Sequence, residues 1–117
     1  TMIRDDDFIR ELLFEAEESN DPYLLAVMVM NPDPADLKRH VHAELLCDAG
    51  LFETVSKGVY RITNQGHDYA QVIKSDDIWK KTKDGASKVG GVTIGIMRDI
   101  AVGYVRQQAA EKLGIPL

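Results

Sequence analysis

Apolar residues near the start of the chain recur at helical spacing. From Phe8 to Ala16 they are separated by one, three and four positions, which is the stripe of an amphipathic helix. Three aspartates at positions 5–7 precede the stripe, where a helix N-terminus favours negative charge. The pattern predicts a helix over about residues 5–18, ended by the polar cluster at 19–22.

The next apolar run, Tyr23 to Met30, is apolar on both faces, short, and bounded by prolines. Such a run predicts a buried strand, with a short helix as the alternative. After it, Asp33 can cap a helix and Pro34 can take its first position. This second helix should extend to Ala49.

A helix, a glycine stop and a hairpin follow one another in the middle of the chain. Leu45, Leu46 and Ala49 recur at helical spacing, and Gly50 is suited to a left-handed helix end. Two β-type runs, 51–55 and 59–63, are then joined by Ser56, Lys57 and Gly58. This order is typical of a winged helix, so we expect an α+β, winged-helix-like fold with its wing near 51–63.

Helical patterns fill the rest of the chain. We expect a helix over about 64–74 capped by Thr63, a second from Asp76 to about Lys83, glycine breaks at 85 and 90–91, and a last helix over 94–113 capped by Thr93. The chain is thus predicted to be a single domain, residues 1–117. Its core would be residues 1–75, and residues 76–117 would be a C-terminal helical extension.

Size and composition narrow the class of protein. The 117 residues suit one globular domain, with 44% hydrophobic and 28% charged residues. The longest apolar run is far shorter than the ~20 residues that span a bilayer. Cys47 is the single cysteine, so it cannot form an intramolecular disulfide, in agreement with a reducing compartment. We expect a cytoplasmic protein that does not enter a membrane.

The charge distribution is uneven. The net charge is −5, but residues 1–21 hold two basic and eight acidic side chains, whereas residues from 34 onward hold twelve basic and ten acidic ones. Nucleic-acid binding draws most of its affinity from Lys and Arg. The acidic first helix could face away from DNA or face a basic partner, and composition does not choose between them.

Only a few cations are placed to contact DNA. The candidates are Lys38 and Arg39 at the start of the helix before the wing, Lys57 and Arg61 in the wing, and Lys80 and Lys81 on the flank beside Trp79. The strip that this helix leaves for solvent holds His40, Glu44, Cys47 and Asp48, which suits base reading poorly. We therefore expect a non-enzymatic interaction or regulatory module. The alternative is a sequence-specific DNA-binding transcriptional regulator.

Metal binding and catalysis find little support in the residue pattern. Two positions along a helix separate His40 from His42, so their side chains point about 200° apart and cannot share an ion. One of them is expected to be packed or capping and the other solvated. Cys47 lies near Glu44 and Asp48, which disfavours a thiolate, so a semi-buried thiol is expected. We predict no metal, no cofactor and no enzymatic activity.

The last helix is apolar enough to pack on a neighbouring molecule. We expect the partner to be another protein or a second copy of the chain, as a homodimer through this helix.

Several motifs together resemble a known family. They are RDDDFIRELLFEAE at 4–17, HAELLCDAGL at 42–51, the set Thr63, Gly66, His67 and Tyr69, and the set Asp76, Asp77, Trp79, Lys81 and Lys83. In this order they resemble the bacterial and prophage domain-of-unknown-function family twenty-five-thirteen. Ala43, Tyr69 and Lys74 depart from that family's pattern. The resemblance implies a winged-helix-like fold and no established activity.

The resemblance also draws attention to Gly66, His67, Asp76, Asp77 and Trp79. We expect structural roles: Gly66 lets a helix pass close to the wing, His67 and the aspartates cap or pair locally, and Trp79 anchors the C-terminal part. A ligand site is the alternative.

Overall fold

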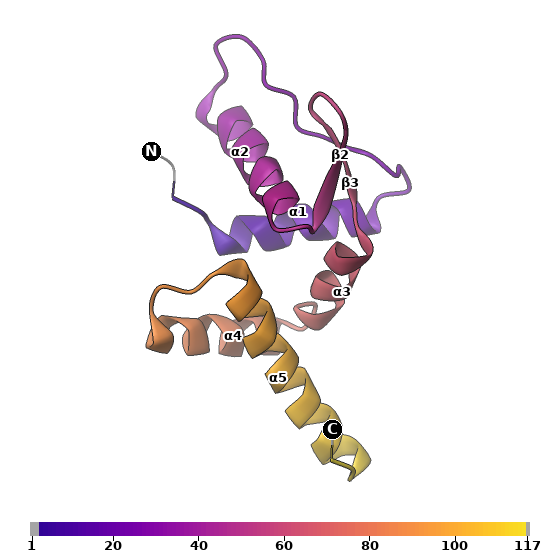
Figure 1. Cartoon of the computed structure of the whole chain (residues 1–117), viewed down its shortest axis with the longest axis vertical. Coiled ribbons are helices and arrows are strands. Elements are labelled where there is room, and N and C mark those ends of the chain that lie inside the picture. The colour runs from indigo at the N-terminus through magenta and orange to yellow at the C-terminus, as the bar shows by residue number, and fades with distance from the viewer. Residues whose placement is uncertain (1–2, 117) are drawn as a thin grey trace. The chain divides into compact units, whose positions relative to one another are not determined.

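The computed structural model describes residues 3–116, and Figure 1 shows its elements along the chain. They are α1 (Asp6–Glu18), β1 (Leu24–Leu25), α2 (Pro34–Asp48), β2 (Phe52–Ser56), β3 (Val59–Ile62), α3 (Asn64–Val72), α4 (Asp76–Val89) and α5 (Ile94–Leu113). Helices with a small antiparallel sheet confirm the predicted α+β class. The chain divides into two compact units, the first ending at Ala70 and the second beginning at Gln71. None of the described helices has the length and apolar character needed to cross a membrane.

The amphipathic helix predicted over residues 5–18 is confirmed as α1. Asp5 caps it, since its Oδ1 accepts a hydrogen bond from the Phe8 amide at 3.1 Å. This bond satisfies one of the amide groups that a helix N-terminus leaves open. Ile9, Leu12 and Leu13 are buried along one face, so the apolar stripe does face the core.

Both ends of α2 are also as predicted. Asp33 caps the N-terminus and Pro34 is the first helical residue. Ala49 is the C-cap, and Gly50 has a φ of 77°, a backbone angle that residues with a Cβ rarely adopt. The Leu51 amide then bonds back to the last turn of the helix. The chain is thereby turned directly into the hairpin.

β2 and β3 form the hairpin predicted near 51–63. They are antiparallel, with Thr54 opposite Tyr60 and a bulge between Thr54 and Ser56. β1 pairs antiparallel with the other side of β3, so the sheet order is β1-β3-β2. At the hairpin turn, a Cβ on Gly58 would come within 2.8 Å of Val27 Cα. The turn therefore needs glycine both for its φ of 73° and for this close approach.

The core of the first unit lies among α1, α2 and the sheet. Leu13, Leu46, Leu51 and Tyr60 are among its fully buried side chains. The Tyr60 hydroxyl donates a hydrogen bond to the Glu44 carboxylate of α2. Burial, reinforced by this bond, raises the pKa of Tyr60 well above its ordinary value. The bond satisfies the one polar group that the ring carries into the core.

The prediction of a buried strand over Tyr23–Met30 is wrong in length and in burial. Only Leu24 and Leu25 pair with β3, the four residues Val27–Met30 are exposed, and the alternative short helix does not form there either. An apolar run shows that residues tolerate burial. It does not show that a second layer exists to cover them.

The first unit has the order of elements expected of a winged helix, helix, strand, helix and hairpin. In a helix-turn-helix, a further helix precedes the recognition helix and crosses the DNA backbone. Here the residues between β1 and α2 form no helix. The α+β class is confirmed, whereas the winged-helix assignment stays an interpretation.

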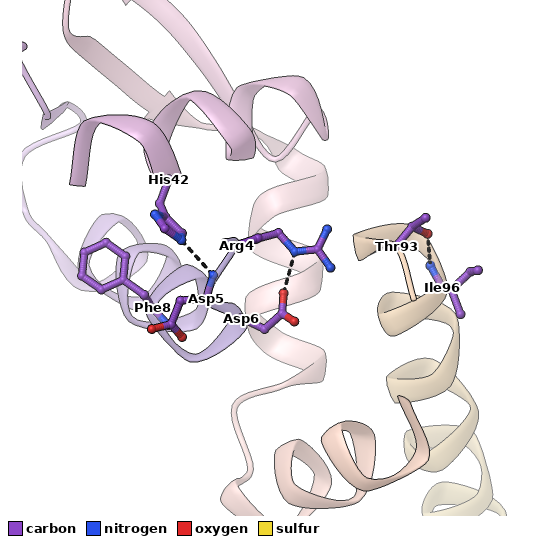
Figure 2. Close-up of polar contacts among 7 residues, drawn as sticks. All are labelled: Arg4, Asp5, Asp6, Phe8, His42, Thr93 and Ile96. Carbon is purple, nitrogen blue, oxygen red and sulfur yellow. Dashed lines mark hydrogen bonds and ion pairs between the residues drawn. The ribbon is translucent and has the colours of Figure 1, made fainter. Parts of the chain in front are cut away.

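In the second unit, side-chain caps start both long helices. The Ser75 hydroxyl accepts a hydrogen bond from the Ile78 amide in α4 at 3.3 Å. The Thr93 hydroxyl accepts one from the Ile96 amide in α5 at 3.1 Å (Figure 2). The predicted cap and bounds of the last helix are confirmed.

Two helix ends differ from the prediction. α3 ends at Val72, slightly before the predicted position, and α4 continues past Lys83 to Val89. Gly85 does not break α4. A Cβ there would lie 3.3 Å from the Tyr104 hydroxyl of α5, so the glycine allows the two helices to approach closely. The turn itself is made by Gly90 and Gly91, both with positive φ.

Candidate functional site

Lys38, predicted to contact DNA, forms an ion pair within the first unit. Its Nζ donates a hydrogen bond to Asp5 Oδ2 at 2.8 Å and lies 4.7 Å from the centre of the Phe8 ring. The bond from Lys38 is the main reason that the pKa of Asp5 lies below its ordinary value. Lys38 thus links α2 to the cap of α1.

Arg39 forms more hydrogen bonds within the unit than Lys38 does. Its Nη1 and Nη2 donate to the two carboxylate oxygens of Glu15 at 2.8 and 2.6 Å, and its Nε donates to the Leu25 carbonyl at 2.9 Å. The pair lowers the pKa of Glu15 and raises that of Arg39. One guanidinium therefore joins α1, β1 and α2.

Of the wing cations, Arg61 forms an ion pair with Glu53 on the neighbouring strand. Lys57 is exposed at the hairpin turn. Three of the four cations predicted for the main DNA contact, Lys38, Arg39 and Arg61, are therefore paired with carboxylates of their own unit. Their role in DNA binding stays a prediction.

The flanking cations lie in the second unit. Lys80 is exposed, and Lys81 pairs with Asp77 one turn earlier in α4 at 3.3 Å. Trp79 is buried, with Lys83 Nζ 5.7 Å from the centre of its ring. Asp76 and Asp77 form the first turn of α4. This is the place that the helix dipole favours for carboxylates.

The two units differ in charge. The first unit holds six basic and fourteen acidic side chains, a formal charge of −8, and the second holds eight basic and five acidic ones, a charge of +3. The unit that contains the hairpin is therefore the acidic one. An excess of carboxylates repels phosphate groups at long range.

Gly66 is placed as predicted, where α3 passes close to the hairpin. A Cβ on it would lie 2.2 Å from the Leu51 carbonyl oxygen and 2.6 Å from Ile62 Cγ1. The Thr63 hydroxyl accepts a hydrogen bond from the Gly66 amide at 3.0 Å and donates one to the Gly50 carbonyl at 2.7 Å. This helix start can approach the strand ends only with glycine at position 66.

His67 pairs with a residue distant in sequence, whereas a local partner was predicted. Its Nδ1 lies 3.5 Å from Oε2 of Glu17, fifty positions earlier in α1. The Glu17 side chain is 12% exposed and that of His67 48%. The spacing of residues in the sequence could not predict this contact.

An open cavity of about 350 Å³ contains this pair, at the C-terminal end of α1. We call it the α1-end cavity. Its lining comes from the end of α1, the turn that follows it, β3 and α3, and its polar or aromatic members are Glu17, Ser19, Asn20, Asp21, Tyr23, Arg61 and His67.

The two histidines of α2 have different partners. His42 is fully buried; its Nε2 accepts a hydrogen bond from the Asp5 amide at 2.9 Å, as Figure 2 shows. This confirms a packed, capping histidine. The Nδ1 of His40 bonds to the Ala26 carbonyl at 2.8 Å, so the prediction that the other histidine is solvated is wrong. Among the described residues no group of three or more His, Cys, Asp or Glu is arranged to hold a metal ion.

Cys47 is semi-buried, as predicted. Burial raises the pKa of its thiol, and the carboxylates of Glu44 and Asp48 add to the effect. The thiolate needed for a nucleophile is therefore disfavoured.

One surface was missed by the sequence prediction. We call the residues Leu25, Val27, Met28, Val29 and Met30 the apolar segment; their side chains are between 44% and 92% exposed. The uninterrupted apolar composition of this stretch could have indicated an exposed binding surface, but the sequence prediction interpreted it as a buried strand.

One of the comparisons with known proteins identifies a family. The family model described as "Hypothetical protein (DUF2513)" matches residues 3–93, which include the first unit from α1 onward and all of α4. The searches of curated proteins and of solved structures gave no match. Because the match spans well over half of its length and agrees with the motif resemblance, the chain belongs to the DUF2513 family.

Proposed function

We propose that this protein is a non-enzymatic interaction module whose first unit binds a partner protein through the apolar segment. The observation that carries the proposal is the exposure of five apolar side chains within six consecutive residues. Contiguous apolar surface of this kind is characteristic of sites that bind partners. Methionines suit such a site because their side chains adapt to different shapes.

The contacts of the segment favour recognition by side chains. Arg39 and His40 already bond to the carbonyl groups of Leu25 and Ala26, and a bulge interrupts β2, the other edge strand. Both features work against the addition of a partner strand to the sheet. The partner would therefore place its own apolar side chains on the segment.

The charge of the first unit suggests the chemistry of the partner. A unit with a formal charge of −8 attracts a basic surface and repels an acidic one. We propose a partner segment that combines apolar and basic residues. The same charge, together with the paired states of Lys38, Arg39 and Arg61, makes DNA the less favoured ligand.

The proposal can be tested by cross-linking from the segment. A photoreactive residue at position 29 would capture the partner, which is then purified and titrated against the chain. The triple variant Leu25→Ser, Val29→Ser, Met30→Ser should weaken binding at least about tenfold. The matched control, Val89→Ser with Leu113→Ser, removes exposed apolar side chains elsewhere and should bind normally. Equal binding by the triple variant, with its fold intact by circular dichroism, would overturn the proposal.

The alternative, a DNA-binding regulator, has its own measurement. Fluorescence anisotropy with random-sequence duplex at about 20 mM NaCl should show no binding. Binding that falls steeply with salt, and that Lys57→Gln with Lys80→Gln abolishes, would instead favour the DNA-binding alternative.

Three further properties are predictions that accompany this proposal. They are a cytoplasmic location, the absence of enzymatic activity, and self-association through α5. For the last, light scattering that gives a monomer near 13.0 kDa would remove the homodimer.

A further inference from the structure

We infer that Met28 and Met30 form a redox-sensitive switch on the apolar segment, in which a peroxide oxidises their thioethers to sulfoxides and so weakens binding of the partner. The inference deepens the proposed function and rests on it, because it adds a mode of regulation to the same docking surface. It starts from the uneven exposure of the methionines in residues 3–116. Met30 is 92% and Met28 44% exposed, whereas Met97 of α5 is 2% exposed.

The start of the apolar segment is anchored through its backbone. The Leu25 carbonyl accepts a hydrogen bond from Arg39 Nε at 2.9 Å. The Ala26 carbonyl bonds to His40 Nδ1 at 2.8 Å, and the Ala26 amide donates to the Gly58 carbonyl at 2.9 Å. Because the chain is held at buried Ala26, the four residues that follow leave the sheet at a fixed point, and their side chains are exposed.

The oxidation transfers one oxygen atom. The thioether sulfur attacks one oxygen of hydrogen peroxide, so that an S–O bond forms and the O–O bond breaks. After a proton transfer the products are the sulfoxide and water, and the two electrons lost by the sulfur are gained by the peroxide. Because the reaction requires access to the sulfur, Met30 should react first, Met28 next and Met97 last.

The thiol of Cys47 competes poorly for the oxidant. It is semi-buried, and its pKa is raised by burial and by two nearby carboxylates. Peroxide reacts with thiolates, which are disfavoured here. In the described part of the chain, the exposed thioethers are therefore the sulfur atoms that a peroxide oxidises first.

Oxidation would change the surface and leave the fold intact. A thioether is apolar and adaptable, whereas a sulfoxide is polar, so oxidation would interrupt the apolar segment at two of its five members. Met28 and Met30 lie outside the helices and strands and outside the buried core, so no core contact is lost. Removing the polar S–O groups from water on binding would cost free energy. The partner should therefore bind the oxidised segment more weakly.

The first test measures the modified sites and needs no partner. The folded full chain and the chain unfolded in urea would be treated with hydrogen peroxide, and the sulfoxide at each methionine would be quantified over time by digestion and mass spectrometry. In the folded chain, Met28 and Met30 should be oxidised at least about tenfold faster than Met97, and in urea all three should react alike. Circular dichroism should show an unchanged fold after Met28 and Met30 are oxidised. Equal rates for the three methionines in the folded chain would overturn the inference.

The second test measures binding of the partner captured from position 29. After removal of the peroxide, the oxidised chain should bind it at least about fivefold more weakly than the untreated chain. Treatment with the two methionine sulfoxide reductases, one for each sulfoxide epimer, should restore binding. Equal binding before and after oxidation would overturn the switch.

Variants make the assignment specific. The double variant Met28→Leu, Met30→Leu keeps the apolar volume but has no oxidisable sulfur in the segment, so it should bind the partner normally and stay insensitive to peroxide. Met97→Leu, at the buried methionine, is the matched control and should remain as sensitive as the unaltered chain. Loss of binding by the oxidised double variant would assign the effect to another residue and overturn the inference.

Failure of the switch can be told apart from failure of the proposed function. If the triple variant of the apolar segment loses the partner but the oxidised chain binds normally, only the switch is wrong. If the triple variant itself binds normally, the docking surface is wrong, and the switch is overturned with it.

Discussion

Both ring nitrogens of His42 are hydrogen-bonded, one within α2 and the other to the start of α1. Its Nδ1 donates to the Lys38 carbonyl at 2.8 Å, and its Nε2 accepts from the Asp5 amide at 2.9 Å. The ring also meets Phe8 edge to face, with ring centres 5.1 Å apart. A fully buried histidine here acts as a second cap for α1, beside the Asp5 side chain.

Replacing His42 by alanine should lower the free energy of unfolding by about 2–4 kcal/mol. The change leaves a cavity and an amide without its acceptor. Urea denaturation would measure the loss. His67→Ala, at a half-exposed side chain, is the control and should change stability by less than about 0.5 kcal/mol. A loss below about 1 kcal/mol for His42→Ala would contradict this role.

Gly66→Ala should be destabilising by about 2–3 kcal/mol, because the new methyl group would meet the Leu51 carbonyl, which is backbone and cannot rotate away. The matched control is Gly103→Ala in the middle of α5. Nothing lies within 4 Å of a Cβ there, so alanine should stabilise the helix by about 0.5–1 kcal/mol. Thermal unfolding by circular dichroism would separate the two. Similar effects of both substitutions would disprove the close approach at Gly66.

Among the elements, α1, β1 and α2 are held together by Arg39. The guanidinium bonds to Glu15 with two parallel hydrogen bonds and to the Leu25 carbonyl with a third. Such a bidentate pair positions elements well, although partial exposure reduces its contribution to stability. The residue that the sequence offered as a DNA contact is thus a structural connector in the first unit.

Arg39→Met should lower stability by about 1–2 kcal/mol near pH 7, and this deficit should shrink on acidification. The pair holds the folded-state pKa of Glu15 below its ordinary value of 4.5. Its contribution is therefore fully present above that value and is lost as the pH falls through the folded pKa.

Urea denaturation at about pH 7 and about pH 3 would measure this change. Arg61→Gln, which breaks an exposed pair of the hairpin, should have only a small effect, below about 0.5 kcal/mol. A deficit for Arg39→Met that is constant with pH would show that the ion pair is not its cause.

At the level of the whole molecule, charge is divided between an acidic first unit and a basic second unit. The acidic unit carries a formal charge of −8. Its carboxylates therefore outnumber its cations, and those without a cationic partner repel one another. Like charges far apart are screened by salt more strongly than paired charges in contact. Net repulsion should therefore dominate the salt dependence of the first unit.

Stability should consequently rise when NaCl is increased from about 10 to about 150 mM. Thermal unfolding followed by circular dichroism would show this as a higher midpoint. The double variant Glu11→Gln, Glu18→Gln removes two exposed carboxylates of α1 and should reduce the dependence. A midpoint that falls with salt would mean that ion pairs outweigh repulsion.

The sequence by itself determined the local features: the caps Asp33, Thr63 and Thr93, the glycine stop at Gly50, and the hairpin turn at Gly58. These depend on side chains and backbone angles within about four residues, so a sequence pattern contains all the information they need. The same reasoning predicted the bounds of α1, α2 and α5 and the α+β class, whereas α4 continues past its predicted end to Val89.

Only the tertiary structure decided which distant residues meet. Lys38 and Asp5 are 33 positions apart, Arg39 and Glu15 are 24 apart, and His67 and Glu17 are 50 apart. It also decided that the apolar segment lies exposed. These facts depend on how packed elements face one another, and no local pattern encodes that. The physical reason is that the burial and the ion pairs of a side chain are determined by the residues that surround it after folding.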